Sequence, residues 1–241
     1  MDINQTITLL ASIGACLTAI SSFFVLKQNK KQREDSYKPQ LVIKKINFES
    51  VEIEPDNAFQ SRWISNDFMS NDYRFALPIV NIGLGSAKQI KAIWSFDFET
   101  YISQINMEAQ KSFASSYVEY KNETLAFISK SGTPSIHNLK LQKEQEIDYI
   151  IPIANSNELS KLYFPMAIIH AYNTYLYFFS KKVKREDFPK FPKIKVEISY
   201  FDIGNKKYKE HFEVIPNFIC LQKKDDTHIS FKGFIETKSI K

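Results

Sequence analysis

Twenty consecutive residues near the start of the chain, from Ile7 to Leu26, contain no charged side chain. A helix rises about 1.5 Å per residue, so a helix of this length spans roughly 30 Å, the thickness of the hydrocarbon core of a bilayer. An isolated segment inside a bilayer satisfies its backbone hydrogen bonds only as a helix. We therefore expect residues 1–26 to form an N-terminal transmembrane anchor.

A cleaved signal peptide is the alternative interpretation of this uncharged stretch. Such a peptide begins with positive charge, has a shorter apolar part and ends in a cleavage site with small residues. Here Asp2 is the only charged side chain before the stretch, which ends in the large apolar residues Phe23–Leu26. The sequence favours an anchor over a signal peptide.

The orientation of the predicted anchor follows from its flanks. The basic residues Lys27, Lys30, Lys31 and Arg33 come directly after it. Because basic residues beside a membrane helix stay on the cytoplasmic side, we expect a single-pass protein of the bacterial inner membrane. Its N-terminus would lie outside, residues 27–40 would form a basic juxtamembrane linker, and the rest would be cytoplasmic.

The net charge of the chain is modest, but its basic residues are clustered. The formal charge is +5, with basic clusters at Lys27–Lys45 and Lys181–Lys195. Basic segments beside a membrane are attracted to anionic lipids. Nucleic-acid binding would need basic residues interleaved with stacking aromatics, and no recognised motif of that kind is present. We expect the lipid bilayer as a partner and no nucleic acid.

The chain beyond residue 40 alternates in a way that predicts a mainly β fold, an immunoglobulin-like β-sandwich at 41–220. Helical spacing indicates insertions near 99–115 and 156–182, with the second helix beginning near Pro165. A polar loop is expected at Glu49–Asn71, and residues 221–241 would form a C-terminal strand or tail. The predicted strands are Leu41–Phe48, Arg74–Ile82, Gln89–Phe98, Thr124–Ser129, His137–Ile153, Ile194–Tyr200 and Tyr208–Val214.

Two turns carry glycine between predicted strands. We interpret Gly83 and Gly85 as turn residues with positive φ rather than as a phosphate loop, because no Gly-Lys-Ser/Thr follows and a strand comes next. Asp202–Asn205 predicts a hairpin turn. The side chain of Asp202 is more typical of an Asx-type turn than of a catalytic carboxylate.

Two motifs carry a resemblance: Val-Asn-Ile-Gly-Leu-Gly-Ser-Ala at 80–87 and Ile-Ser-Tyr-Phe-Asp-Ile-Gly-Asn-Lys-Lys-Tyr at 198–208. The chain resembles a loose group of bacterial single-pass membrane-anchored proteins with an immunoglobulin-like domain. Most members have no assigned function, and some lie near anti-phage systems. The group's pattern Asn-x-Gly-x-x-Ala is matched by Asn81, Gly83 and Ala87 with one extra residue. The group's hairpin pattern, Tyr-x-Asp-x-x-Gly-x-x-Tyr, is matched by Tyr200, Asp202 and Tyr208, with Asn205 at the glycine position and the glycine one position early at Gly204. The resemblance covers about half of the chain and implies a fold, not a chemistry.

Catalytic motifs are missing from the sequence. The histidines His137, His170, His211 and His228 are scattered, with no second ligand at the spacing of a zinc site. No Gly-x-Ser-x-Gly elbow, kinase motif set or paired cysteine–histidine pattern is present. We therefore predict no catalytic, metal-binding or cofactor-binding residue, and a protein that is not an enzyme.

Two sets of residues are candidates for contact with a partner. Aromatic residues form the first set, a possible partner surface, although packing inside the domain is the favoured alternative. Small residues at heptad spacing in the predicted anchor form the second, a possible helix self-association face. The sets are Tyr163, Tyr172, Tyr175, Tyr177 and Phe178, and Thr8, Ser12, Ala15, Ala19 and Ser22.

These observations predict a membrane-anchored cytoplasmic interaction or sensing module without catalytic activity, which binds another protein or itself. Two alternatives stay open. One is a membrane-acting effector of a bacterial anti-phage defence system that assembles through its transmembrane helix. The other is a hydrolase whose catalytic residues are scattered in the sequence.

Overall fold

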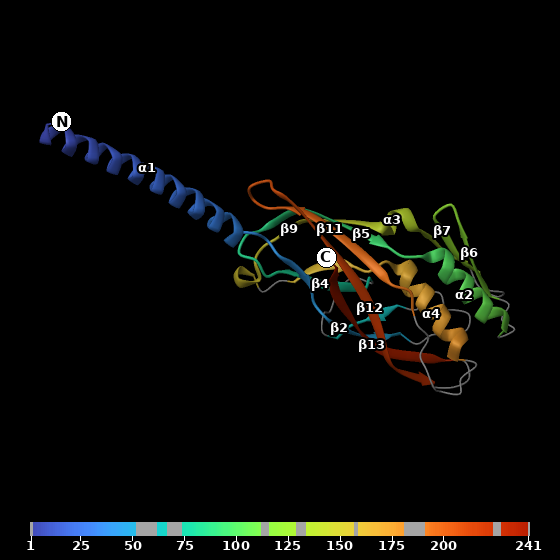
Figure 1. Cartoon of the computed structure of the whole chain (residues 1–241). Coiled ribbons are helices and arrows are strands. Elements are labelled where there is room, and N and C mark those ends of the chain that lie inside the picture. Colours follow the sequence, from blue (N-terminus) through green and yellow to red (C-terminus); the bar gives the residue numbers. More distant parts are fainter. Residues whose placement is uncertain are drawn as a thin grey trace.

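The computed structural model describes residues 2–51, 62–66, 74–111, 116–128, 134–156, 159–180, 191–223 and 228–240. Within these ranges the chain is mainly β, with a long helix that extends away from the β domain at the N-terminus (Figure 1). The helices are α1 (Ile3–Ser36), α2 (Phe98–Lys111), α3 (Leu139–Lys143) and α4 (Met166–Ser180).

The strands form three antiparallel sheets. A seven-stranded sheet has the order β3–β2–β13–β12–β11–β5–β9, and two smaller sheets have the orders β1–β4–β10 and β6–β7–β8. The strands of the large sheet are β2 (Ile46–Ser50), β3 (Trp63–Ile64), β5 (Ala87–Ser95), β9 (Glu144–Ile150), β11 (Ile194–Phe201), β12 (Lys207–Lys223) and β13 (Ile229–Ile240). Those of the small sheets are β1 (Leu41–Ile43), β4 (Ala76–Asn81), β10 (Ser160–Tyr163), β6 (Tyr117–Lys121), β7 (Thr124–Ile128) and β8 (Ser135–Asn138).

Helix α1 replaces the predicted anchor. It covers the uncharged stretch and continues through the basic residues to Ser36. In the described part of the chain, no helix is long and apolar enough to cross a membrane. The predictions of a single-pass transmembrane anchor and of an inner-membrane location are therefore wrong. Both predictions rested on the absence of charged residues. A membrane-spanning helix also needs high average hydropathy, and Ser12, Gly14 and Thr18 lower the hydropathy of this stretch.

Helix α4 packs against strands of the seven-stranded sheet. Nearly all of its side chains are buried, and the ring of Tyr172 lies 6.0 Å from Trp63 of β3 and 6.2 Å from Phe218 of β12. The ring centre of Tyr172 also lies 5.5 Å from that of Tyr101 on α2. The predicted immunoglobulin-like sandwich is not confirmed, and the fold prediction that joined it to a transmembrane helix is wrong. The prediction of a mainly β fold is confirmed.

Local sequence signals account for several elements. Helix α4 begins directly after Pro165, as predicted, and the Pro165 carbonyl accepts the N–H groups of Ile168 and Ile169. The segment before it is strand β10 rather than helix. Strand β5 and helix α2 lie where alternation and helical spacing predict them.

The predicted first strand is in fact two strands that join different sheets. Strand β1 pairs with β4, whereas β2 pairs with β13, so the chain passes from one sheet to the other between Ile43 and Ile46. The predicted loop Glu49–Asn71 contains strand β3, and most of its remaining residues lie outside the described part.

Asp202 lies in the hairpin turn between β11 and β12, but its carboxylate bonds the backbone four residues on rather than two, as an Asx turn would. The Asp202 carboxylate accepts the N–H of Lys206 at 2.9 Å and the hydroxyl of Tyr208 at 3.0 Å. Positive φ occurs at Asn205, where φ is 65°, and not at Gly204. Both carboxylate oxygens of Asp202 therefore accept a hydrogen bond within the hairpin, which is the role of a turn residue.

Candidate functional site

The segment between α1 and β1 is held by one buried side chain, Asn81. Its Oδ1 atom accepts the N–H groups of Gln40 and Gly83, both at 3.0 Å. Its Nδ2 atom donates to the carbonyl oxygens of Gly85 at 2.6 Å and Ile150 at 3.3 Å. Because Asn81 is fully buried, its bond to Gln40 fixes the segment that follows α1 to the β domain, and its other three bonds hold the Asn81 side chain in place.

The glycines of the same motif allow two stretches of backbone to come into contact. A Cβ atom at Gly83 would overlap the carbonyl oxygen of Lys38, and one at Gly85 would overlap the carbonyl oxygen of Tyr37. No described glycine has positive φ, so the predicted reason for these glycines is wrong. Close approach of the segment that follows α1 is what requires them.

A second contact holds this segment from the other side. The Tyr200 hydroxyl lies 2.6 Å from Oε1 of Glu210 and 3.2 Å from the carbonyl oxygen of Pro39. Burial raises the pKa of both the Tyr200 hydroxyl and the Glu210 carboxyl. Helix α1 therefore leaves the domain from a defined seat, which we call the α1 seat: Tyr37–Gln40, Asn81–Gly85, Tyr200 and Glu210.

Beyond the α1 seat, the described side chains of α1 are exposed to solvent. Leu17 is 60 % exposed and Phe23 is 65 % exposed. Of the predicted self-association face, Ser12, Ala15, Ala19 and Ser22 are exposed, and the side chain of Thr8 lies outside the described residues. Other exposed apolar residues of α1 are Ile3, Ile7, Ile13, Ile20, Phe24, Val25 and Leu26. Helix α1 is thus a candidate interaction surface.

The aromatic residues predicted as a partner surface do not form one. Tyr172, Tyr177 and Phe178 are buried, while Tyr163 and Tyr175 are partly buried. Burial of three of the five makes them part of the core around α4. Packing inside the domain, the alternative favoured from the sequence, is the arrangement observed.

Two of the supposedly scattered histidines are in contact. Nε2 of His137, on β8, lies 2.8 Å from Nδ1 of His170, on α4. His170 is 5 % exposed, and Phe127 packs edge-on against both imidazole rings. Burial lowers the pKa of His137, and burial together with His137 lowers that of His170 to about 3. Both rings are therefore neutral at pH 7.

The hydrogen bonds of Gln142 determine the tautomers of this pair. Its Oε1 atom accepts the N–H of Ala167 at 2.9 Å, so its amide nitrogen faces Nδ1 of His137 at 3.0 Å and donates to it. A neutral His137 then carries its proton on Nε2 and donates to Nδ1 of His170. Nε2 of His170 carries a proton that has no acceptor among the described residues.

This tautomer argues against a serine hydrolase at Ser135. The Ser135 hydroxyl lies 3.2 Å from Nε2 of His137. A general base must have a free lone pair toward its nucleophile, and Nε2 of His137 carries a proton instead. Among the described residues, no group of three or more His, Cys, Asp or Glu side chains could hold a metal ion.

The buried histidine pair predicts a loss of stability in acid. In the unfolded chain His170 titrates near 6.5, and in the folded domain near 3. The stability that His170 contributes to the free energy of unfolding is thus complete above about pH 6.5. It falls by about 1.4 kcal/mol per pH unit as the pH decreases toward 3. Urea unfolding between about pH 7.5 and 4.5 should show a flatter pH dependence for His170→Asn than for the wild type.

His211 supplies the matched control, since it is an exposed histidine on β12. The variant His211→Asn removes an exposed imidazole, so it should change the pH dependence less than His170→Asn does. Equal slopes for the wild type and for His170→Asn would contradict a buried neutral His170.

Comparison of the chain with protein-family models, with curated proteins and with solved structures finds no match. The resemblance to the bacterial immunoglobulin-like group therefore stays a prediction. Function has to be inferred from the α1 seat, the exposed helix and the interior sites of the domain.

Proposed function

We propose that the protein is a non-catalytic interaction module that assembles with further copies of itself through helix α1. One observation carries this proposal. Helix α1 extends away from the β domain, and its described apolar side chains have no contact that shields them from solvent (Figure 1). A helix presented in this way is suited to binding another helix.

Exposure of α1 has a free-energy cost that association removes. Each Å² of apolar surface removed from water contributes about 25 cal/mol. An isolated helix gains little stability from its own hydrogen bonds, because most helix stability in proteins comes from packing of one face. A partner that covers the apolar residues of α1 therefore stabilises the helix itself.

A second copy of the chain fits this surface. Ser12, Ala15, Ala19 and Ser22 recur at steps of three and four residues, so they lie on one face of α1. Small residues allow two helices to approach closely, and two-fold symmetry brings the same face of each copy into contact. The uncharged stretch Ile7–Leu26 contains this face, so pairing buries no charged side chain.

The α1 seat supports the same proposal. The hydrogen bond between Gln40 and Asn81 and the close packing of Gly83 and Gly85 hold the segment that follows α1 against the β domain. A flexible tether would need none of these contacts. Fixing the exit of α1 reduces the conformational entropy lost on pairing.

A lysine placed on each face of α1 tests the proposal. Ala15→Lys places a charge on the small-residue face, and Leu17→Lys places the same charge on the opposite side of the helix. Burying an unpaired charge in the contact should weaken association at least about tenfold for Ala15→Lys, and by less than about twofold for Leu17→Lys.

Energy transfer between copies labelled at the C-terminus with donor and acceptor dyes measures this association. The expected result is transfer in the wild type and in Leu17→Lys, and loss of transfer in Ala15→Lys. Equal transfer in all three chains, or no transfer in the wild type, would show that α1 does not pair through this face.

A further inference from the structure

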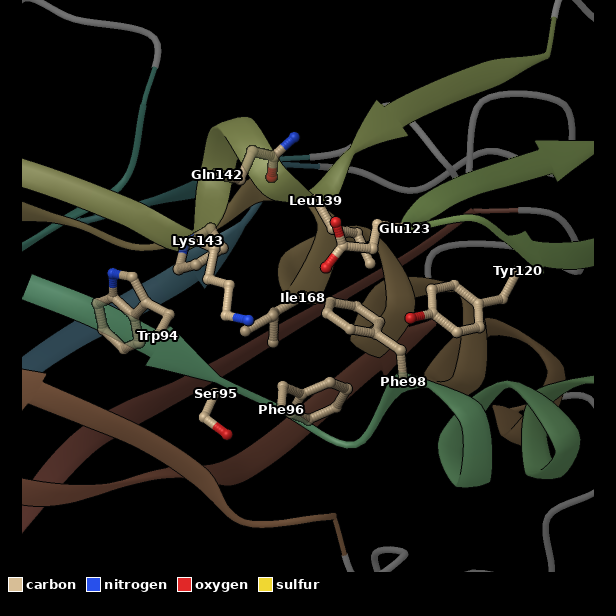
Figure 2. Close-up of a pocket in the computed structure, with 11 residues that line it drawn as sticks. Trp94, Ser95, Phe96, Phe98, Tyr120, Glu123, Leu139, Gln142, Lys143 and Ile168 are labelled. Carbon is tan, nitrogen blue, oxygen red and sulfur yellow. The ribbon is translucent and has the colours of Figure 1, made fainter.

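A pocket lies at the end of the β domain that is remote from α1. It is formed where β5 ends and α2 begins, and is closed by the β6–β7 hairpin, α3 and the first turn of α4 (Figures 1 and 2). Its cavity has a volume of about 130 Å³. An apolar cavity of about 150 Å³ holds a benzene molecule, so this slightly smaller cavity encloses a group of up to about six non-hydrogen atoms, and the charged groups of a larger ligand lie at its mouth.

Four aromatic residues contribute to the pocket wall. Trp94, Phe96, Phe98 and Tyr120 line it together with Ile168. The ring centres of Phe96 and Phe98 are 4.8 Å apart, and those of Phe98 and Tyr120 are 6.4 Å apart in a stacked arrangement. Such a wall favours a ligand with an apolar body and attracts a cation over its ring faces.

Two opposite charges face the same space. The side chains of Glu123 and Lys143 both line the pocket, and Figure 2 shows their charged ends turned toward the region bounded by the aromatic rings. Neither side chain forms an ion pair with a described residue. A ligand with both charges would pair with each of them.

The backbone holds these two charges in a defined relation. Glu123 lies in the tight turn of the β6–β7 hairpin, where φ is 51° at Asn122 and 56° at Glu123. The Glu123 carbonyl accepts the N–H of Leu139 at 2.9 Å, which joins this turn to the first residue of α3. Lys143 is at the other end of the same short helix. The turn and helix α3 are therefore joined directly beside the pocket mouth.

We propose that this pocket binds a small zwitterion with an aliphatic body, an α-amino acid of the size of valine or leucine. Its ammonium group pairs with the Glu123 carboxylate and lies near the faces of Phe98 and Tyr120. Its carboxylate pairs with the Lys143 ammonium group. Its aliphatic side chain packs against Phe96 and Ile168. Because the pocket and α1 are at different ends of the domain, this proposal does not rest on self-association.

Calorimetric titration of the full-length chain with L-leucine tests the proposal. Isovalerate and 3-methylbutylamine, which each carry one of the two charges, serve as comparison ligands at the same ionic strength. Leucine should bind, and each single-charge analogue should bind at least about tenfold more weakly, because one pocket charge is then left without a partner. Absence of binding by both leucine and valine would overturn the proposal, as would equal affinity for leucine and an analogue.

Variants of the two charged residues separate their roles. Glu123→Gln should weaken leucine binding about tenfold and leave the affinity for isovalerate nearly unchanged. Lys143→Met should weaken leucine binding to a similar extent and leave the affinity for 3-methylbutylamine nearly unchanged. The controls Glu119→Gln and Lys140→Met change exposed residues of β6 and α3 that do not line the pocket. Weakening by the controls as large as by the pocket variants would refute specific recognition.

Discussion

Replacing Gly85 with valine is expected to lower the free energy of unfolding of the β domain by about 2–3 kcal/mol. The Cβ atom of the new side chain would overlap the carbonyl oxygen of Tyr37, which belongs to backbone and cannot rotate away. Relief of the overlap requires the segment that follows α1 to move, which breaks the bond between Gln40 N–H and Asn81. Urea unfolding measures the loss, and faster chymotryptic cleavage after Tyr37 reports release of the segment.

Leu84→Val is the matched control in the same loop. Leu84 is 62 % exposed, so its replacement introduces a β-branched residue without an overlap. Its unfolding midpoint and cleavage rate should stay close to those of the wild type. A Gly85→Val chain with wild-type stability and wild-type chymotryptic cleavage after Tyr37 would show that the α1 seat is not packed as described.

Replacing Trp63 with alanine should have the largest effect of all, a loss of about 3–5 kcal/mol. Trp63 is 1 % exposed, and its ring stacks on Phe48 at 4.2 Å and on Tyr172 at 6.0 Å. Its indole N–H donates to the side chain of Asn173 at 2.9 Å. Truncation removes the ring that joins β2, β3 and α4 and leaves a cavity among them.

Trp63→Phe separates packing from hydrogen bonding. It keeps a stacked ring and removes the donor to Asn173. The phenylalanine variant should therefore lower the free energy of unfolding by about half as much as the alanine variant. Denaturant unfolding at pH 7 measures both variants. An alanine variant with less than about 1 kcal/mol of destabilisation would contradict the central position of Trp63 in the core.

The sequence locates the α1 seat without explaining it. The motif around Asn81, Gly83 and Gly85 predicts a turn at the correct position, because glycine and asparagine between two apolar strands are typical of turns. The actual constraint is contact with Tyr37–Gln40, more than forty residues earlier in the chain. Local periodicity carries no information about such a contact.

Long-range contacts also explain what the sequence does not predict. Trp63 lies in a segment whose polar composition predicts a loop, and it becomes a core residue only because α4 packs over it. His137 and His170 are thirty-three positions apart, and their contact depends on how β8 meets α4. The same holds for Glu123 and Lys143, which belong to a hairpin turn and a helix end.

The wrong anchor prediction and the unconfirmed sandwich prediction have different physical origins. The anchor was predicted from the lack of charge in Ile7–Leu26, a criterion that does not weigh the small and hydroxyl-bearing residues among the apolar ones. The sandwich was predicted from alternation, which identifies strands such as β5 and β11 but not their partners. Helix α4, most of whose residues are buried, packs against strands of the large sheet, a contact that alternation does not predict.

Sedimentation equilibrium of the full-length chain is the most direct test of assembly through α1. One copy has a mass of 28.1 kDa. We predict that the wild-type chain at micromolar concentration has at least twice this mass, that Leu17→Lys matches it, and that Ala15→Lys sediments as single copies. A wild-type chain that sediments with the mass of one copy over the whole concentration range would contradict the proposed function.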